Sequence, residues 1–321
     1  MGQQREHANQ NKRDNIDNPH DKGYKHLLSS KKAFIEMLKS FIKEKWVQDI
    51  DETEMMLVNK SYISSDFSEK EADIVYKIKL QEKEIIFYVL LELQSTVDFE
   101  IPIRLLFYMT EIWRDTLKNI DNKKRARKEF RLPAIIPMVL YNGAASWTAC
   151  KTFKEVLNGY EIFGKYMVDF TYFLLDVNRY SKEELHKLSN LMGSVFLLDQ
   201  KMDTDEFKIR LRKLIKTLAK LDAERLQLFK TWFKKIIKPK LPQKIQTEVE
   251  KIIDEANPKE VEQMVYNLEH TLEEMQHEAE QRGIQKVIQN MLGNNIDIET
   301  IHKMTGMPID KVKKIQKGIV Q

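Results

Sequence analysis

The chain has 321 residues, of which 42% are hydrophobic and 32% charged, so it can bury a sizeable core beneath a heavily charged surface. Its net charge of +4 is compatible with a polyanionic partner without requiring one. A single cysteine, Cys150, excludes an internal disulfide, and no apolar run approaches the roughly 20 residues that cross a bilayer. The polar N-terminus lacks the apolar segment of a signal peptide, so we expect a cytoplasmic protein without membrane contact.

The N-terminal part of the chain combines helical and strand-like patterns. Residues 1–18 hold almost no apolar side chains and are expected to form a disordered tail. From residue 24 to residue 42, apolar side chains recur at helical spacing, which predicts a first helix. Strand-like segments follow at residues 55–63, 73–80 and 85–94.

A second helix and two further strands come next. Pro102 favours a helix start, and apolar residues continue at helical spacing to about Lys118. The apolar run 134–140 is typical of a buried strand and ends at the turn pair Asn142-Gly143. The segment 168–177 is a further strand candidate. Helices and strands in this order predict an α/β sandwich.

Beyond Ser181 the strand signals stop, and helical spacing dominates to the end of the chain. We expect a helical region over residues 179–256 and a long amphipathic helix over residues 257–292. In the long helix apolar residues step four and three residues alternately, at Val261, Val265, Leu268, Leu272, Met275 and Ala279. The seam is compatible with a coiled coil that pairs subunits of a homo-oligomer, and equally with a helix packed on its own domain.

Residues 293–321 predict two short helices joined by a turn at Thr305-Gly306-Met307-Pro308. Lysines give the second helix basic character, at Lys311, Lys313, Lys314 and Lys317. The pattern is similar to a small helix-turn-helix, a unit that contacts DNA in many proteins. Helix pairs of this kind also cap a neighbouring helix or pair subunits, so both interpretations stay open.

The hairpin between residues 73 and 94 carries the most informative pattern. If residues 81–84 form the turn and Leu80 lies opposite Ile85, alternate side chains of both strands form one apolar face. The same count places Asp73 opposite Glu92 on the other face, with Gln94 two residues further along.

Two carboxylates opposed on paired strands repel each other, with Cβ atoms about 4.5–5.5 Å apart. A shared divalent cation relieves this repulsion, and oxygen ligands of this kind suit Mg²⁺ or Mn²⁺. Such an ion can activate water for attack on a phosphodiester. Other interpretations stay open: a bulge can shift the register, Asp73 can mark a strand start in solvent, and Lys77 and Lys79 can neutralise the pair.

Asp73, followed after an eighteen-residue interval by Glu92-Leu93-Gln94, resembles the signature of the PD-(D/E)XK nuclease superfamily. More closely, the chain resembles the Rpn family of recombination-promoting nucleases, also known as putative transposases. The stretches that carry this resemblance are His20-Asp21-Lys22, Asp73-Ile74-Val75-Tyr76, Glu92-Leu93-Gln94-Ser95, Pro102 to Tyr108, and Leu132 to Gly143 with Trp147. The resemblance implies an α/β nuclease-like domain over residues 19–178, with a mixed sheet flanked by helices and followed by an all-helical C-terminal region.

The resemblance further implies a metal-dependent DNA endonuclease of low sequence specificity that promotes recombination. In that case Asp73 and Glu92 hold Mg²⁺, with Mn²⁺ as a second candidate, and the Leu93 carbonyl supplies a further ligand. Gln94 stands where the wider superfamily has lysine, and its neutral amide adds no positive charge beside the phosphate. Slow cleavage is therefore expected, and the alternative is a catalytically silent nuclease-like protein that binds DNA or another partner.

Further residues are candidates for contacts with DNA or the metal. Arg104 and Tyr108 lie four residues apart, so they share a helix face and either contact phosphate, brace the carboxylates or form a solvated or structural pair. Glu36 is either a further acid near the metal or an ordinary exposed glutamate. The densest basic run is either a phosphate-binding segment or a solvated loop, and it comprises Lys123, Lys124, Arg125, Arg127, Lys128 and Arg131.

Overall fold

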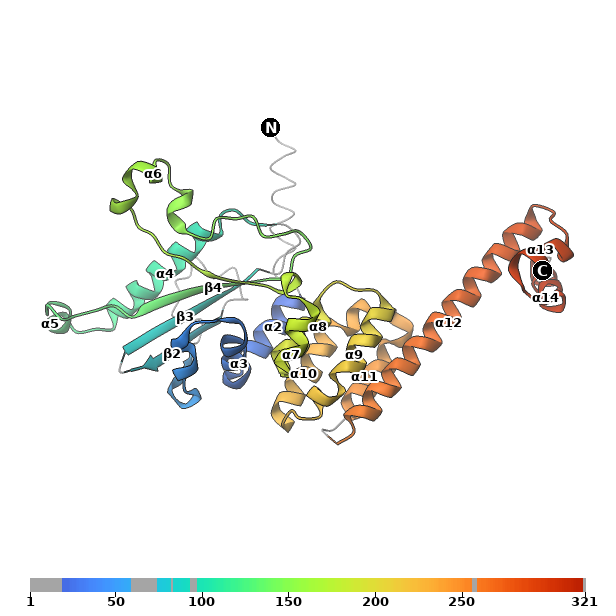
Figure 1. The fold of residues 1–321 in the computed structure, drawn as a ribbon, viewed down its shortest axis with the longest axis horizontal. Coiled ribbons are helices and arrows are strands. Elements are labelled where there is room, and N and C mark those ends of the chain that lie inside the picture. The colour runs from blue at the N-terminus through green and yellow to red at the C-terminus, as the bar shows by residue number, and fades with distance from the viewer. Residues whose placement is uncertain (1–18, 59–73, 82, 93–96, 256–258, 320–321) are drawn as a thin grey trace.

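The computed structural model describes residues 19–58, 74–81, 83–92, 97–255 and 259–319 (Figure 1). The predicted disordered tail, residues 1–18, lies outside these ranges. A five-stranded sheet forms one end of the molecule, a group of helices lies beside it, and a long helix leads from that group to a small helical unit at the C-terminus (Figure 1). No helix in the described ranges is both long and apolar enough to span a membrane.

Strands and helices alternate in the first part of the chain, and only helices follow in the later described ranges. The strands are β1 (Met55–Leu57), β2 (Ile74–Leu80), β3 (Lys83–Glu92), β4 (Ala134–Tyr141) and β5 (Phe173–Asp176). The helices around them are α2 (Pro19–Leu28), α3 (Lys31–Phe41), α4 (Ile101–Lys118), α5 (Asn122–Arg125) and α6 (Tyr160–Phe163). The later helices are α7 (Lys182–Leu188), α8 (Leu191–Asp199), α9 (Thr204–Leu218), α10 (Ala223–Ile236), α11 (Gln243–Glu255), α12 (Val261–Gly293), α13 (Ile298–Thr305) and α14 (Ile309–Ile319). The predicted α/β class and the helical C-terminal region are confirmed.

The sheet is mixed, with the strand order β1-β2-β3-β4-β5. β1, β2 and β3 pair antiparallel, whereas β3, β4 and β5 pair parallel. Pro137 is tolerated in β4 because the ladder to β5 begins only at Met138. β5 is shorter than the predicted strand 168–177, since residues just before it pair with another segment: the Phe170 carbonyl accepts the Phe153 N–H (2.9 Å) and Thr171 bridges to Thr152.

The two faces of the sheet pack into separate hydrophobic clusters. Tyr76 of β2 and Phe87 of β3 join the main core together with α2 and α3. Val75, Ile86 and Tyr88 belong to the opposite face, which packs under α4. The predicted alternation of the hairpin side chains between two faces is therefore confirmed.

The register of the hairpin differs from the prediction by two residues. Leu80 pairs with Lys83, and Ile74 pairs with Val89 rather than with Leu91. The turn is tighter than expected because Gln81 adopts a φ of 47°, in the left-handed region that two-residue hairpin turns use. A shift of two residues preserves the face of each side chain but changes its partner. The register of the described residues therefore does not support the prediction that Asp73 lies directly opposite Glu92.

The predicted first helix is in fact two helices, α2 and α3, separated at Ser29 and Ser30. The Ser29 hydroxyl donates to the Lys25 carbonyl (2.6 Å), and Ser30 is extended at the start of α3. Serine side chains compete with helix continuation in this way. The break allows α2 to pack against α10 while α3 packs against α8.

One hydrophobic core joins the sheet to the helical region. It extends from Tyr24 in α2, across the inner face of the sheet, to Leu272 in α12. Its fully buried side chains include Trp232 and Phe196 from the helical region as well as Tyr76 from the sheet. The sequence-based domain boundary at residue 178 therefore crosses a continuous core rather than a linker.

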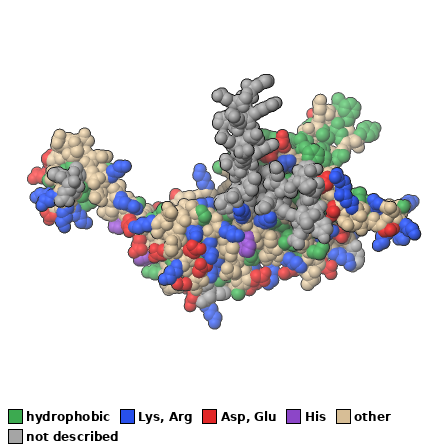
Figure 2. Space-filling model, turned by 180° about the vertical axis from the view of Figure 1, so that it is seen from behind, with side chains coloured by type: hydrophobic (Ala, Val, Ile, Leu, Met, Phe, Trp, Pro, Cys, Tyr) green, Lys and Arg blue, Asp and Glu red, His purple; other side chains and the backbone are tan. Residues whose placement is uncertain are grey.

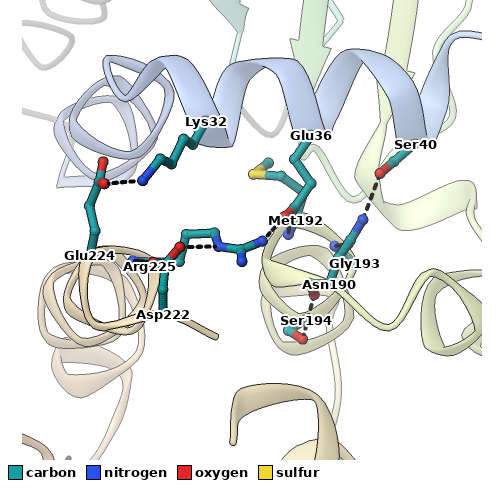
Figure 3. A network of polar contacts seen from close by, with 10 residues as sticks. All are labelled: Lys32, Glu36, Ser40, Asn190, Met192, Gly193, Ser194, Asp222, Glu224 and Arg225. Carbon is teal, nitrogen blue, oxygen red and sulfur yellow. Dashed lines mark hydrogen bonds and ion pairs between the residues drawn. The ribbon is translucent and has the colours of Figure 1, made fainter. Parts of the chain in front are cut away.

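Polar contacts reinforce this junction between α3, α8 and α10 (Figure 3). Glu36 of α3 accepts the backbone N–H of Met192 at the start of α8 (2.7 Å) and pairs with Arg225 of α10 (3.3 Å). Asn190, the N-cap of α8, donates its side-chain amide to the Ser40 hydroxyl (2.9 Å). Glu36 is thus engaged at a helix junction and only 13% exposed, so the interpretation as an ordinary exposed glutamate is wrong.

The first half of α12 packs into the main core. Val261, Val265, Leu268 and Leu272 of the predicted heptad seam are buried there, and α12 packs against α9 and α11. Because these four side chains are already covered within one chain, they are not available for a coiled coil between subunits. The first half of the helix is therefore packed on its own domain, as one of the two interpretations expected.

Candidate active-site edge of the sheet

Three parallel strands end at one edge of the sheet, and two of them end in acids. Glu92, the last residue of β3, pairs with Tyr141, the last residue of β4. Tyr141 pairs in turn with Asp176, the last residue of β5. Neighbouring strands are about 4.8 Å apart, so the backbones of Glu92 and Asp176 lie about 10 Å apart across this row. Ligands of α/β sheets bind preferentially beside the carboxyl ends of parallel strands.

Asp176 is a nearly buried acid, with 8% of its surface exposed. Its Oδ2 lies 3.8 Å from Nε of Arg179, and within the described ranges its Oδ1 has no hydrogen-bond partner. Burial raises the pKa of this carboxyl above its ordinary value, and the charge of Arg179 and the backbone N–H groups of Asn178 and Trp147 oppose that rise. A buried carboxylate with an open oxygen is unfavourable unless a cation or a donor approaches it. Asp176 was missed in the sequence, although an acid that directly follows Phe173-Leu174-Leu175 marks the end of a strand.

The predicted metal ligands lie only partly in the described ranges. Asp73, Leu93 and Gln94 are outside them, and Glu92 is placed by its backbone pairing. Where the chain is described, no group of three or more His, Cys, Asp and Glu side chains converges. Asp176 nevertheless gives this edge a carboxylate, the type of donor that suits Mg²⁺, and the backbone of Glu92 lies in the same row.

Helix α4 covers the sheet beside this edge. Tyr108 is buried and stacks on Tyr88 of β3, with their ring centroids 5.0 Å apart. Arg104, one turn earlier, pairs with Asp98 (2.6 Å), and its side chain is 17% exposed. The Tyr108 ring is therefore buried between α4 and β3, and a phosphate contact by Arg104 has to compete with Asp98.

A cavity of about 490 Å³ lies beyond the ends of β4 and β5, between the sheet and the helical region. The side chain of Asp199 in its wall is fully buried and accepts hydrogen bonds from Tyr24 (2.8 Å) and Lys240 (3.0 Å). Asn178, just after β5, donates to the side-chain oxygen of Asn142, just after β4 (2.6 Å). These contacts hold the edge at which β4 and β5 end against the helical region. No sequence signal marked them, because the partners are far apart in the chain.

The predicted basic run lies away from this edge. It occupies α5 and the turn after it, and all six of its side chains are exposed at a projecting tip (Figure 2). α4 joins two parallel strands, so it runs from their carboxyl ends back to their amino ends. Its 18 residues span about 27 Å. A phosphate contact by the basic run would therefore be separate from the row of Glu92 and Asp176.

Comparison with known proteins gives a family. The chain is 25% identical over 135 residues to the recombination-promoting nuclease RpnD of Escherichia coli O157:H7, a match that covers 41% of this chain and 49% of that relative. The matched region is thus about half of the relative's length, and no solved structure gives a significant match. The family described as "Putative transposase, YhgA-like" matches residues 18–229, which include the whole sheet and extend into α10. This chain therefore belongs to the YhgA-like, Rpn-related family of putative transposases.

Proposed function

We propose that this chain is a metal-dependent endonuclease that hydrolyses DNA phosphodiester bonds with little sequence preference and promotes recombination. Family membership and the similarity to a recombination-promoting nuclease support this class of activity. The structural observation that carries the proposal is the row of Glu92, Tyr141 and Asp176 at the carboxyl ends of three parallel strands. A PD-(D/E)XK type of fold and a cytoplasmic location belong to the same proposal.

In this proposal Asp73 and Glu92 hold one Mg²⁺ or Mn²⁺ ion, and the Leu93 carbonyl is a further ligand. An ion held there would supply Lewis acidity toward a phosphoryl oxygen and toward the attacking water. Gln94 orients the water or the phosphate, since its amide both donates and accepts hydrogen bonds. The amide adds no positive charge there, so cleavage is expected to be slow.

Residues around the edge support binding of a cation and of a phosphate. Asp176 adds negative charge that favours a divalent cation. Arg104 can exchange Asp98 for a phosphate oxygen, because a guanidinium group binds carboxylates and phosphates in the same geometry. α4 begins at Ile101, beside this edge, so the positive end of its dipole favours an anionic phosphate.

Nicking of supercoiled plasmid by Glu92→Gln and Asp73→Asn in Mg²⁺ tests this assignment. Each amide keeps the volume of the side chain but removes a charged ligand, so we expect cleavage to fall by at least about 100-fold, or about 2.7 kcal/mol of barrier. The matched control is Glu84→Gln, at the opposite end of β3, where the side chain is 53% exposed. The control should cut like the parent.

A folded Glu92→Gln or Asp73→Asn protein that nicks plasmid at the parental rate would contradict the proposed ligand set. Equal loss in Glu84→Gln would contradict it as well, because the effect would then reflect the strand rather than the edge. Circular dichroism of each variant separates loss of cleavage from loss of fold.

The neutral amide at position 94 favours a second candidate, a catalytically silent nuclease-like protein that binds DNA or a protein partner. This candidate predicts DNA affinity without cleavage in any divalent cation. The plasmid assay separates the two, since cleavage that requires Glu92 is expected of the endonuclease alone.

A further inference from the structure

The C-terminal end of the chain forms a small helical unit with its own core. Ile288 of α12, Ile301 of α13 and Val312 of α14 are fully buried against one another, in a cluster separate from the main core. Flanking side chains complete this cluster: Ile284, Met291, Leu292, Ile296, Ile298, Met307 and Ile315. The family match ends at residue 229, so this terminal unit (residues 284–319) lies outside it.

The terminal unit is joined to the rest of the molecule by a single helix (Figure 1). Contacts of α12 with the helical region reach as far as Glu278, which forms an ion pair with Lys244. The terminal core begins at Ile284. Residues 279–283 between them are exposed, so the unit is held away from the main body and presents its surface to solvent.

The connection between α13 and α14 has the length and the glycine of a helix-turn-helix connection. Three residues, Gly306 to Pro308, separate the two helices. Gly306 has a φ of 68°, in the left-handed region that favours glycine, and its N–H donates to the His302 carbonyl (2.9 Å). Short turns of this kind set the second helix across the first, as in units whose second helix enters the major groove of DNA.

The outer side of α14 is basic. Val312 and Ile315 face the terminal core, whereas Lys313, Lys314 and Lys317 are exposed. Over residues 284–319 the sequence has six Lys or Arg against three Asp or Glu. Blue side chains accordingly gather on this lobe in Figure 2. The helix that the fold presents outward is therefore also a concentrated source of positive charge.

We propose that the terminal unit binds duplex DNA, with α14 in the major groove and Lys313, Lys314 and Lys317 on backbone phosphates. A packed three-helix core, a three-residue turn and an outward lysine face together favour this ligand over a generic polyanion. The surface is distinct from the carboxyl edge of the sheet. Its binding is independent of the proposed nuclease activity, since contact with DNA needs no metal.

Fluorescence anisotropy of a labelled 20-base-pair duplex in EDTA, with the full-length chain, tests the proposal without cleavage. The test variant is Lys313→Gln/Lys314→Gln/Lys317→Gln. The matched control is Lys213→Gln/Lys216→Gln/Lys220→Gln, which removes the same charge from exposed positions on and beside α9. The α14 variant should bind at least about tenfold more weakly at 0.1 M salt, and its salt slope should fall by about 2.7, for three lost phosphate contacts. The control should match the parent.

Equal affinities and salt slopes for the parent and the α14 variant would overturn the proposal. So would equal weakening in the α9 control, because only net charge would then matter. A duplex RNA of the same length should compete poorly, since its major groove is too narrow for a helix. Equal competition by duplex RNA would overturn major-groove binding, and retained far-ultraviolet circular dichroism shows that the variant is folded.

Discussion

Asp176 carries a prediction about stability at the residue scale. Burial raises its carboxyl pKa in the folded protein, so the charged form is disfavoured relative to the unfolded chain. A group whose pKa is raised in the folded state stabilises that state fully below its unfolded pKa, about 3.9. This stabilisation is lost as pH rises through the folded pKa. We therefore expect Asp176→Asn to raise the melting temperature at pH 7, and the gain to vanish in acid below the unfolded pKa.

Calorimetry in EDTA at several pH values measures this effect. Asp49→Asn is the control, because the Asp49 side chain is exposed and its replacement should leave the melting temperature at pH 7 unchanged. A melting temperature at pH 7 that is equal to or below that of the parent would show that Asp176 is well solvated or paired in the folded state.

For single residues, the sequence predicted the face of the sheet on which a side chain lies better than the residue with which it pairs. The alternation of Val75, Tyr76 and their neighbours was correct, because apolar side chains on two faces bury in two different clusters. The register was wrong by two residues, since the left-handed conformation of Gln81 has no signal as clear as Asn-Gly. Asp176 was missed because its row with Glu92 exists only through pairing of β3, β4 and β5.

Among the elements, α8 depends on a carboxylate from another helix. Glu36 accepts the Met192 N–H in the first turn of α8, where backbone N–H groups have no partner within the helix. We expect Glu36→Ala to lower the free energy of unfolding by about 1–3 kcal/mol, because it leaves that buried donor unpaired and Arg225 without its partner. Glu36→Gln should lose less, since its amide oxygen can still accept the N–H. Urea unfolding measures all three proteins.

Glu44→Ala provides the control, since Glu44 is exposed just beyond α3 and makes no capping hydrogen bond. Equal stability of Glu36→Ala and Glu44→Ala would mean that water replaces Glu36 at no net loss. A larger loss in Glu36→Gln than in Glu36→Ala would contradict the proposed acceptor role.

The sequence predicted which segments form helices and strands. It did not predict where these elements end or which elements they pack against. The apolar spacing of residues 24–42 continues through Ser29 and Ser30, so it gave no sign that two helices pack on different neighbours. The heptad spacing of α12 is equally suited to an intermolecular and an intramolecular partner. Only the presence of α9 and α11 beside Val265 and Leu268 decides between them.

At the scale of the whole molecule, the core that joins the sheet to the helical region predicts where the chain can be shortened. A chain of residues 1–256 loses Val261, Val265, Leu268 and Leu272 from the main core and should be strongly destabilised or insoluble. A chain of residues 1–281 keeps those side chains and removes only the terminal unit. We expect it to melt within a few degrees of the full-length protein, as measured by circular dichroism.

The opposite result would contradict a continuous core: a soluble, cooperatively melting chain of residues 1–256 means that α12 is not part of it. Light scattering on the 1–281 chain gives a second check. Because Val261, Val265, Leu268 and Leu272 of the seam are covered within one chain, replacing the exposed seam residue Ala279 with Glu should leave the oligomeric state of this chain unchanged.

The most direct test of the proposed activity is a plasmid-nicking series with the purified full-length protein in Mg²⁺, Mn²⁺, Ca²⁺ and EDTA. A carboxylate-held hard cation predicts slow nicking in Mg²⁺ and Mn²⁺, and none in EDTA. It also predicts that nicking in Mg²⁺ disappears with Glu92→Gln while Glu84→Gln retains it. Nicking that persists in EDTA, or the absence of nicking in every cation by folded protein, would contradict a metal-dependent endonuclease.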